Sequence, residues 1–242
     1  MSPLPGHLHH RQHRRRQRAA ARSTGPLAAY YAAPVPDDRT PAAELRLLAV
    51  DVETTGLDPA TDRVLSVGFV PVDGDAIVLA GARQVIVRPE EPEEPDDPDD
   101  PDAGVGQSAV FHGLTDDVVA AGAPLAEAVE ATLEACAGRV LLAHWATLEV
   151  GLLSRACERH FGAPFVPPVV DTLLLARRLS RRSPDETRSG ELRLWSARER
   201  YGLPRYAAHA ALTDALACAE LYLAQVAELD ADRRVTLKRL RS

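Results

Sequence analysis

The chain has 242 residues, which is enough for one sizeable α/β domain with tails and a full hydrophobic core. Hydrophobic residues make up 45% and charged residues 26%, and no stretch approaches the roughly 20 consecutive apolar residues of a membrane span. This composition excludes a membrane protein. The formal net charge of −7, from 28 Lys and Arg against 35 Asp and Glu, argues at face value against a partner as anionic as nucleic acid.

The charges are unevenly distributed along the chain, and this weakens the argument from net charge. Residues 89–102 contain nine carboxylates with a Pro at every third position, and removing those nine acids changes −7 to +2. Repelling charges and prolines without amide donors predict an extended, solvated loop insertion. Residues 1–22 contain six Arg and no acid. Residues 1–22 are therefore expected to form a basic, disordered arm that increases affinity for a phosphate backbone. With the Pro-rich entry that follows, this basic, largely disordered N-terminal region covers residues 1–44.

The cysteines and the N-terminal region bear on the cellular compartment. Cys136, Cys157 and Cys218 are odd in number and lack CxxC spacing, so we expect buried thiols and neither a disulfide framework nor a zinc site. Residues 26–34 are weakly apolar and bracketed by prolines, unlike the Leu-rich core of a secretory signal. Export remains an alternative, but the sequence favours the cytoplasm.

Hydrophobic patterning predicts strands first and strand–helix alternation afterwards. Strands are expected at 45–51, 64–73, 76–87, 140–143 and 169–170, with a hairpin turn at 73–75, and helices after Thr115 and at 124–138, 147–161, 172–180, 192–201 and 209–229. This order predicts an α/β domain over 45–229, in which three antiparallel strands and then parallel strands form a mixed sheet flanked by helices. Residues 230–242 are expected to form a C-terminal tail.

The first predicted strand ends in two carboxylates. Asp51 and Glu53 are two residues apart, so both side chains point to the same face of the sheet. Their mutual repulsion is relieved if one is protonated or if a hard cation neutralises both, which favours a Mg²⁺ or Mn²⁺ site. Two solvated acids at a strand end are the simpler alternative for the pair alone.

Three further segments accompany this pair in a familiar order. Asp51–Leu57 (DVETTGL) is followed by Phe111–Thr115 (FHGLT), Leu142–Glu149 (LAHWATLE) and His209–Ala215 (HAALTDA). These segments resemble, in order, the DxETTGL, HGIT, AHNAxFD and HxAxxDA elements of the DEDD-type 3′→5′ exonucleases. The last element is typical of the His-containing (DEDDh) subgroup, which includes the proofreading epsilon subunit of bacterial DNA polymerase III. The resemblance covers about 45–228.

The resemblance implies a ribonuclease H-like fold and hydrolysis of a nucleoside monophosphate from a 3′ end with two divalent cations, Mg²⁺ or Mn²⁺. By resemblance, Asp51 contacts both ions, Glu53 and Asp214 bind the ion that activates the attacking water, and Glu149 serves the second ion. His209 is then the general base, since the ordinary pKa of imidazole suits that task at neutral pH. A paired metal site is what in-line phosphodiester hydrolysis requires.

The same resemblance assigns substrate contacts. Thr54, Thr55, Leu57 and His112 fall where the family holds the terminal nucleotide, although strand and turn packing would also account for the two threonines. Asp171 fits a family element too, but a helix N-cap explains it equally well. The implied partner is nucleic acid with a free single-stranded or frayed 3′ end, with DNA favoured over RNA although no base-reading element distinguishes them.

The sequence departs from the family pattern in its third segment. Glu149 stands where the pattern has Asp, and Trp145 stands where it has Asn. The extra methylene extends the carboxylate by roughly 1.5 Å. Either Glu149 completes an adjusted active site, or the chain has lost catalysis and is a module that binds nucleic acid or a protein partner. About 13 residues follow the last predicted helix, so we expect a free-standing repair or turnover role, with polymerase association left open.

Overall fold

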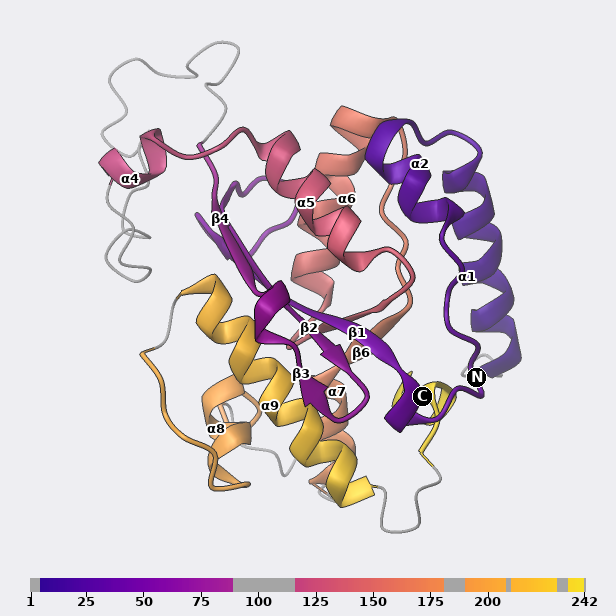
Figure 1. The fold of residues 1–242 in the computed structure, drawn as a ribbon, viewed down its shortest axis with the longest axis vertical. Helices are drawn as coiled ribbons and strands as arrows, with labels where there is room; N and C mark the ends of the chain where they lie inside the picture. Colours follow the sequence, from indigo (N-terminus) through magenta and orange to yellow (C-terminus); the bar gives the residue numbers. More distant parts are fainter. Residues whose placement is uncertain (1–4, 89–115, 181–189, 208–209, 230–234, 242) are drawn as a thin grey trace.

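A computed structural model of the chain describes residues 5–88, 116–180, 190–207, 210–229 and 235–241. In this part of the chain, one central sheet lies between two groups of helices (Figure 1). No helix within these ranges is both long enough and apolar enough to cross a bilayer.

The sheet is mixed, as the sequence predicts. Its strands are β1 (Arg46–Thr54), β2 (Val64–Asp73), β3 (Ala76–Ile77), β4 (Arg83–Ile86), β5 (Val140–Ala143) and β6 (Val169–Asp171). The strand order is β3-β2-β1-β5-β6, and β4 also pairs with β2. Strands β1 to β4 pair in antiparallel fashion, whereas β5 and β6 run parallel to β1, so β1 is the central strand.

The third predicted strand, 76–87, is in fact interrupted. It consists of β3, a 3-10 turn η2 (Leu79–Gly81) and β4. β3 pairs with Val72 and Asp73, β4 pairs with 66–69, and Pro71 falls in the gap between them. Proline has no amide hydrogen to donate to a neighbouring strand, so the ladder cannot run continuously across it.

The helices follow the predicted order with small shifts at their ends. They are α4 (Asp116–Ala120), α5 (Leu125–Cys136), α6 (Thr147–Phe161), α7 (Thr172–Leu179), α8 (Leu194–Glu199) and α9 (Ala211–Leu229). α6 ends at Gly162, whose φ of 76° is the left-handed C-cap conformation that glycine favours. The predicted N-cap Thr115 of α4 lies outside the described residues.

Alternation along β1 separates the two layers of the core. Leu48, Val50 and Val52 point into the cluster packed against α5 and α6, whereas Leu47 and Ala49 point into the cluster packed against α9. Asp51 and Glu53 continue the second series. Both carboxylates therefore belong to the face that α9 covers.

The N-terminal region differs from the predicted disordered arm. It forms α1 (Pro5–Ala20) and α2 (Gly25–Ala32), which lie along the side of the domain near α5 and α6 (Figure 1). Ala19, Leu27 and Tyr30 are buried in the α5–α6 cluster. The sequence argument took the region as a uniformly basic segment, and it overlooked this small set of apolar anchors.

Polar and aromatic contacts fix the same helices. Arg16 donates to the Tyr30 hydroxyl (2.9 Å) and to the Val166 carbonyl (3.1 Å), and its guanidinium lies 4.8 Å and 4.7 Å from the ring centres of Tyr30 and Tyr31. The Tyr31 hydroxyl donates to the Pro164 carbonyl at 2.6 Å. Arg16, one arginine of the basic run, therefore stabilises the packing of α1 against α2 and the domain.

The C-terminal segment, predicted as a tail, also contributes to the core. It contains α10 (Leu237–Arg241), and Val235, Leu237 and Leu240 are buried in the α9 cluster. The backbone of Leu237 donates to the Thr40 carbonyl at 3.0 Å. The C-terminal segment is thus joined to the segment that leads into β1.

Candidate active site

Three of the predicted carboxylates converge at one place. Asp51 and Glu53 extend from β1, and Asp214 extends from the first turn of α9. One carboxylate oxygen of each lies within 4.8 Å of the others. Glu53 and Asp214 are buried, whereas Asp51 is partly exposed. Three of the four carboxylates that the resemblance assigns to metal binding are therefore brought together.

A glycine that the sequence argument overlooked makes this convergence possible. Gly68 on β2 is the direct cross-strand partner of Asp51, and a Cβ atom at this position would overlap the backbone of Ala211 and Leu212 at the start of α9. Only glycine allows the helix to approach the sheet so closely. An isolated Gly within an apolar strand was the available signal for such a contact.

Glu149 lies outside the group of three but acts on it. It is buried in the first turn of α6, with 3% of its surface exposed, and its charge helps to raise the pKa of Asp51. Its Oε2 atom has no hydrogen-bond partner among the described residues. A buried acceptor without a donor is costly in a finished structure and suits an oxygen that serves as a metal ligand.

The electrostatics of the pocket favour a bound cation. Burial, and next the charges of Glu149, Asp214 and Glu53, raise the pKa of Asp51 well above its ordinary value. Burial and then the charge of Asp214 raise the pKa of Glu53 to about 7. Burial is also the main cause that raises the pKa of Glu149. A hard divalent cation would relieve this crowding, and an all-carboxylate set fits Mg²⁺ or Mn²⁺.

Asp171 orients the start of α6, and thus Glu149. Its carboxylate accepts from Leu173 N (2.9 Å) and Leu174 N (3.4 Å) at the start of α7, which confirms the predicted N-cap. It also accepts from Trp145 N (3.1 Å) and Ala146 N (3.0 Å). One acid therefore fixes the N-terminal ends of two neighbouring helices.

Trp145 occupies an unusual backbone conformation at this junction. Its φ is +78°, which within the described chain is the one positive value outside glycine. Asn tolerates this region far better than a bulky residue does, so the Trp in place of the family's Asn carries strain. Its side chain is 42% exposed. The strained turn directs the chain from β5 into the helix that carries Glu149.

The end of β1 and the loop that follows hold three of the four predicted substrate residues, Thr54, Thr55 and Leu57. The pairing of β1 with β2 shifts between Glu53 and Thr54, which marks a bulge where the carboxylates end and the loop begins. The Thr54 hydroxyl donates to the Gly56 carbonyl, and the Thr55 hydroxyl donates to Asp62 at 2.9 Å. Both hydroxyl groups therefore build the loop itself.

Leu57 is at the exposed part of the same loop, with 67% of its surface accessible. The loop is attached to α6, since Arg155 donates to the carbonyl of Asp62 and Gly151 leaves room for the ring of Pro59. Its contact with substrate stays a prediction. His112 and His209 lie outside the described residues, so their roles stay predictions from the sequence.

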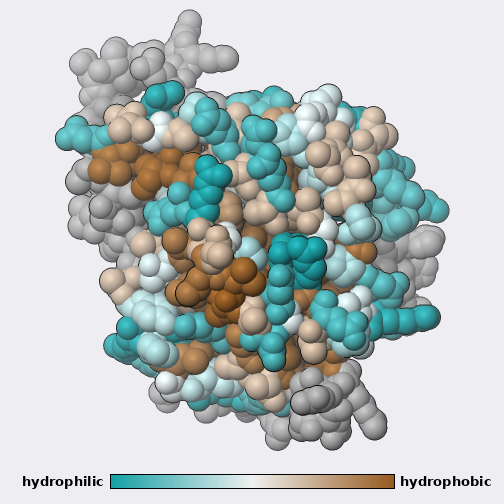
Figure 2. All heavy atoms as spheres, viewed as in Figure 1, coloured by the Kyte–Doolittle hydropathy of each residue, from teal (hydrophilic) through white to brown (hydrophobic). Residues whose placement is uncertain are grey.

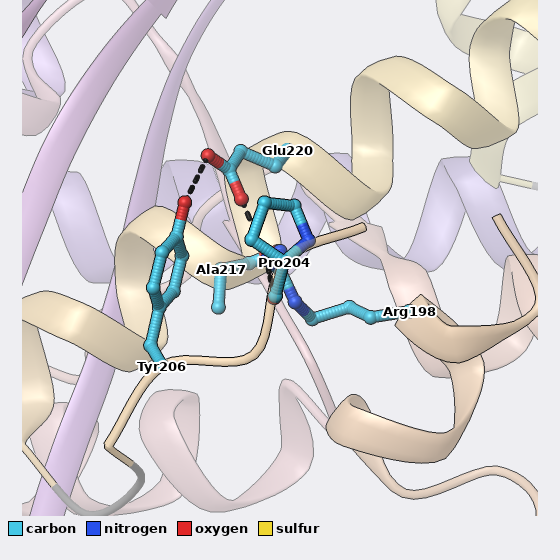
Figure 3. A network of polar contacts seen from close by, with 5 residues as sticks. All are labelled: Arg198, Pro204, Tyr206, Ala217 and Glu220. Carbon is cyan, nitrogen blue, oxygen red and sulfur yellow. Dashed lines mark hydrogen bonds and ion pairs between the residues drawn. The ribbon is translucent and has the colours of Figure 1, made fainter. Parts of the chain in front are cut away.

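A buried arginine fixes the segment that leads to His209 (Figure 3). Arg198 of α8 donates to the carbonyl groups of Ala217 (2.6 Å) and Pro204 (2.9 Å) and to the carboxylate of Glu220 (2.7 Å). The Tyr206 hydroxyl donates to the other oxygen of Glu220 at 2.7 Å. The network ties residues 204–206 to α9, and the sequence argument did not identify it.

Comparison with protein families decides the class of the chain. A family model described as "Exonuclease" (RNase_T) matches residues 48–222, which include all four carboxylates. The chain belongs to the exonuclease family. The predicted resemblance to DEDD-type 3′→5′ exonucleases is confirmed.

Curated relatives match over only a small share of their own length. The polymerase named "DNA polymerase III PolC-type" from Thermotoga maritima is 26% identical over 176 residues, which is 73% of this chain and 11% of the relative. The protein of the same name from Streptococcus pneumoniae is 36% identical over 119 residues, or 48% of this chain and 8% of the relative. This exonuclease domain thus corresponds to one small part of these proteins.

Solved structures support the fold. Exonuclease I of E. coli in complex with a dT13 oligonucleotide superimposes with a TM-score of 0.61 at 16% identity, over 77% of this chain and 42% of that one. Exonuclease X in complex with 5′ overhanging duplex DNA superimposes with a TM-score of 0.54 at 22% identity, over 81% of this chain and 97% of that one. The predicted ribonuclease H-like fold is confirmed by the sheet topology and by these neighbours.

Proposed function

We propose that this chain is a metal-dependent 3′→5′ exonuclease that releases nucleoside monophosphates from nucleic-acid ends. The observation that carries the proposal is the convergence of Asp51, Glu53 and Asp214 within 4.8 Å in a domain of the exonuclease family. Phosphodiester hydrolysis needs charge stabilisation at both the attacking and the leaving oxygen. A crowded carboxylate pocket that recruits cations is suited to that task.

The proposed cofactors are two divalent cations, Mg²⁺ or Mn²⁺. Asp51 would contact both, Glu53 and Asp214 would hold one, and Glu149 would hold the other, with its buried Oε2 as the donor. When bound, the cations would lower the pKa of the attacking water and neutralise charge on the departing 3′ oxygen. The extra methylene of Glu149 is accommodated in this proposal by the turn at Trp145, through which α6 is entered.

His209 is the proposed general base. It precedes Asp214 by five residues in the HAALTDA segment, so it would accept the proton of the attacking water beside the carboxylates. Support comes from the neighbouring network, since Arg198 and Tyr206 fix the segment that leads into residue 209. Replacing His209 by Ala is expected to lower the rate by about 10²–10⁴-fold.

The proposed substrate is a free 3′ end, single-stranded or frayed, with DNA preferred over RNA. Support comes from the related folds, since Exonuclease I is described with a dT13 oligonucleotide and Exonuclease X with overhanging duplex DNA. Thr54, Thr55, Leu57 and His112 would hold the terminal nucleotide. The polymerase relatives suggest a link to DNA synthesis, so association with a polymerase is part of the proposal to be tested. Three buried free cysteines suit a cytoplasmic location.

The decisive experiment is a product assay with a 5′-labelled oligonucleotide in matched DNA and RNA versions. Wild type with Mg²⁺ or Mn²⁺ should give a ladder that shortens from the 3′ end and release nucleoside monophosphates. Asp51→Asn should abolish both, because it removes the proposed ligand of both ions without changing side-chain size. Asp75→Asn is the matched control, because Asp75 is exposed at the turn between β2 and β3.

Two outcomes would contradict the proposal. Equal product formation in EDTA would remove the metal dependence. Binding of the oligonucleotide without turnover in either metal would select the alternative, a catalytically impaired module that binds nucleic acid. A ladder from RNA alone would leave the reaction intact and reverse the substrate preference.

A further inference from the structure

A large basic groove lies between α1, the N-terminal half of α6 and α7. Its volume is about 1060 Å³, and its walls come from α1, the start of α6, β6, α7 and α10. The charged side chains that line it include six arginines, namely Arg11, Arg14, Arg15, Arg18, Arg178 and Arg241. One lining residue is acidic, Asp171. Arg241 forms an ion pair with Asp38 at 3.1 Å, and the other arginines leave the groove positive in a chain whose net charge is −7.

Four of these arginines form one face of α1. Arg11, Arg14, Arg15 and Arg18 follow the i, i+3, i+4, i+7 spacing that places side chains on the same side of a helix. All four are exposed, and within the described part of the chain none forms a hydrogen bond or an ion pair. Hydrophilic residues line the outer edge of the molecule where α1 lies (Figure 2).

The adjacent face of α1, which begins at the edge of the groove with Gln12, fixes the helix in place. Gln12 donates to the Pro167 carbonyl at 3.0 Å, Arg16 bonds to Tyr30 and Val166, and Ala19 is buried. The four exposed guanidinium groups are therefore held on a rigid element. They extend over about 10 Å of helix, at 1.5 Å per residue.

The single acid of the groove contributes little negative field. The Asp171 carboxylate accepts four backbone N–H groups, two at the start of α6 and two at the start of α7. The positive ends of two helix dipoles thus face this carboxylate and offset its charge. The groove as a whole remains attractive to an anion.

The floor of the groove is apolar. Leu174, 55% exposed, and the half-buried Val150 form its surface, and Phe165 lies buried beneath them. Proteins that hold single-stranded nucleic acid combine a positive groove for phosphates with surfaces against which base faces pack, for the most part aromatic side chains; here aliphatic side chains offer that surface. A double helix buries its base faces and would make no use of such a floor. This combination therefore favours a single strand.

The groove reaches the N-terminal end of α6, whose first turn also carries Glu149, on the side of the helix that faces the sheet. Ala146 and Thr147 line the groove, and Glu149 lies two residues further along the same first turn. A strand that rounds the N-terminal end of α6 to reach Glu149 would have its preceding nucleotides near α1. α1 precedes the segment matched by the exonuclease family, which begins at residue 48.

We propose that this groove binds the phosphate backbone of the single strand on the 5′ side of the nucleotide being removed. The inference rests on the proposed exonuclease function, because it assigns the strand that the pocket would shorten. The arginines of α1 contact successive phosphates, and the apolar floor contacts sugars and bases. Substrates of several nucleotides are thereby favoured over dinucleotides.

The test separates binding from turnover. Binding of a fluorescent 12-nucleotide strand is measured in EDTA, where no hydrolysis occurs, at several salt concentrations. A variant with Gln at positions 11, 14, 15 and 18 should flatten the slope of log affinity against log salt by about 2 to 3, at about 0.7 per phosphate contact. Affinity at low salt should fall at least tenfold. Gln retains helix propensity, so α1 should persist.

Two matched variants control for charge and folding. Substitution of Gln for Arg39, Arg46, Arg83 and Arg159, four exposed arginines outside the groove, removes the same charge and should leave the slope near that of wild type. A Lys variant at 11, 14, 15 and 18 keeps the charge and should restore most of the slope. The groove assignment would be overturned if the α1 variant and the control Gln variant flattened the salt slope equally, or if neither changed it.

A turnover measurement distinguishes failure of the groove from failure of the proposed function. In Mg²⁺ or Mn²⁺, the preference in kcat/KM for the 12-nucleotide strand over a dinucleotide should fall at least tenfold in the groove variant. An unchanged preference would overturn the inference while hydrolysis itself stands. If binding depends on the groove arginines but the protein hydrolyses neither substrate, the proposed function is overturned and the groove assignment stands. Tighter binding to vesicles containing phosphatidylserine than to the strand would assign the groove to a membrane surface and overturn the proposal.

Discussion

The carboxylate pocket and the basic groove concentrate charge in opposite ways. In the pocket, Asp51, Glu53 and Asp214 meet within 4.8 Å, and burial together with mutual repulsion raises the pKa of the first two. In the groove, the arginines of α1 are exposed and separated along a helix. Buried charges depend strongly on a partner, whereas exposed charges are screened by water. Substitutions in the two regions should therefore differ in their effect on stability.

The largest expected effect concerns Arg198, a buried cation that contrasts with the exposed arginines. Arg198→Met removes the donor to Glu220 and to two carbonyl groups, so it should lower the free energy of unfolding by about 3–5 kcal/mol. Urea denaturation measures the change. Arg200→Met is the control two residues away, because its ion pair with Glu228 is half exposed and should contribute less than about 1 kcal/mol. Similar losses in both would show that burial does not decide the effect.

Gly68→Ala should separate the two halves of the carboxylate pocket. The added methyl group would overlap the start of α9 and displace Asp214 from Asp51, at an expected cost of about 1–3 kcal/mol in stability. Nuclease activity per folded molecule should fall by about 10²-fold, since a displacement of about 1 Å suffices for such a loss.

Gly74→Ala provides the control for that displacement. It introduces a comparable clash with Ala43, and a strained φ, at the turn between β2 and β3. Stability should again fall, but activity per folded molecule should be retained. Parallel loss of activity in both variants would contradict a specific role of Gly68.

A smaller effect tests the cost of charge in the pocket. Glu149→Gln should raise the stability of the metal-free protein by on the order of 1 kcal/mol, since it replaces a buried acid by a neutral amide. The same change should reduce both activity and the stabilisation that Mg²⁺ gives to wild type. Thermal unfolding with and without Mg²⁺ measures both. Arg14→Gln, in the groove, should change metal-free stability by less than about 0.5 kcal/mol.

The two regions also differ in how far the sequence reveals them. Asp51 and Glu53 could be placed on one face because a strand has a period of two, and the order of motifs added Glu149 and Asp214. Gly68 could not be assigned a partner, because a close approach of α9 depends on packing between distant segments. The face formed by Arg11, Arg14, Arg15 and Arg18 was hidden for the same reason: the basic run indicates a helix only once Leu27 and Tyr30 anchor it.

The smallest expected effect is on how the free energy of unfolding depends on pH, through a histidine next to the carboxylate pocket. His144 lies between β5 and Trp145, with Nε2 2.8 Å from the Leu192 carbonyl and Nδ1 2.8 Å from the Thr172 hydroxyl. Burial is the main cause that lowers its pKa below the ordinary value of about 6.5. The folded protein thus binds fewer protons than the unfolded chain at this site. Stability from His144 is complete above that value and is lost as the pH falls below it.

His144→Gln should therefore lose less stability than wild type when the pH is lowered from 7.5 to 5.5, even if it is less stable at pH 7.5. Urea denaturation at both pH values gives the comparison, and subtraction between the two proteins removes the contribution of the carboxylates. His13→Gln, at an exposed position on α1, should reproduce the pH dependence of wild type. A His144→Gln profile parallel to that of wild type would show that the imidazole is free to protonate in the folded state. Such a result would contradict its burial as a neutral link between β5 and α7.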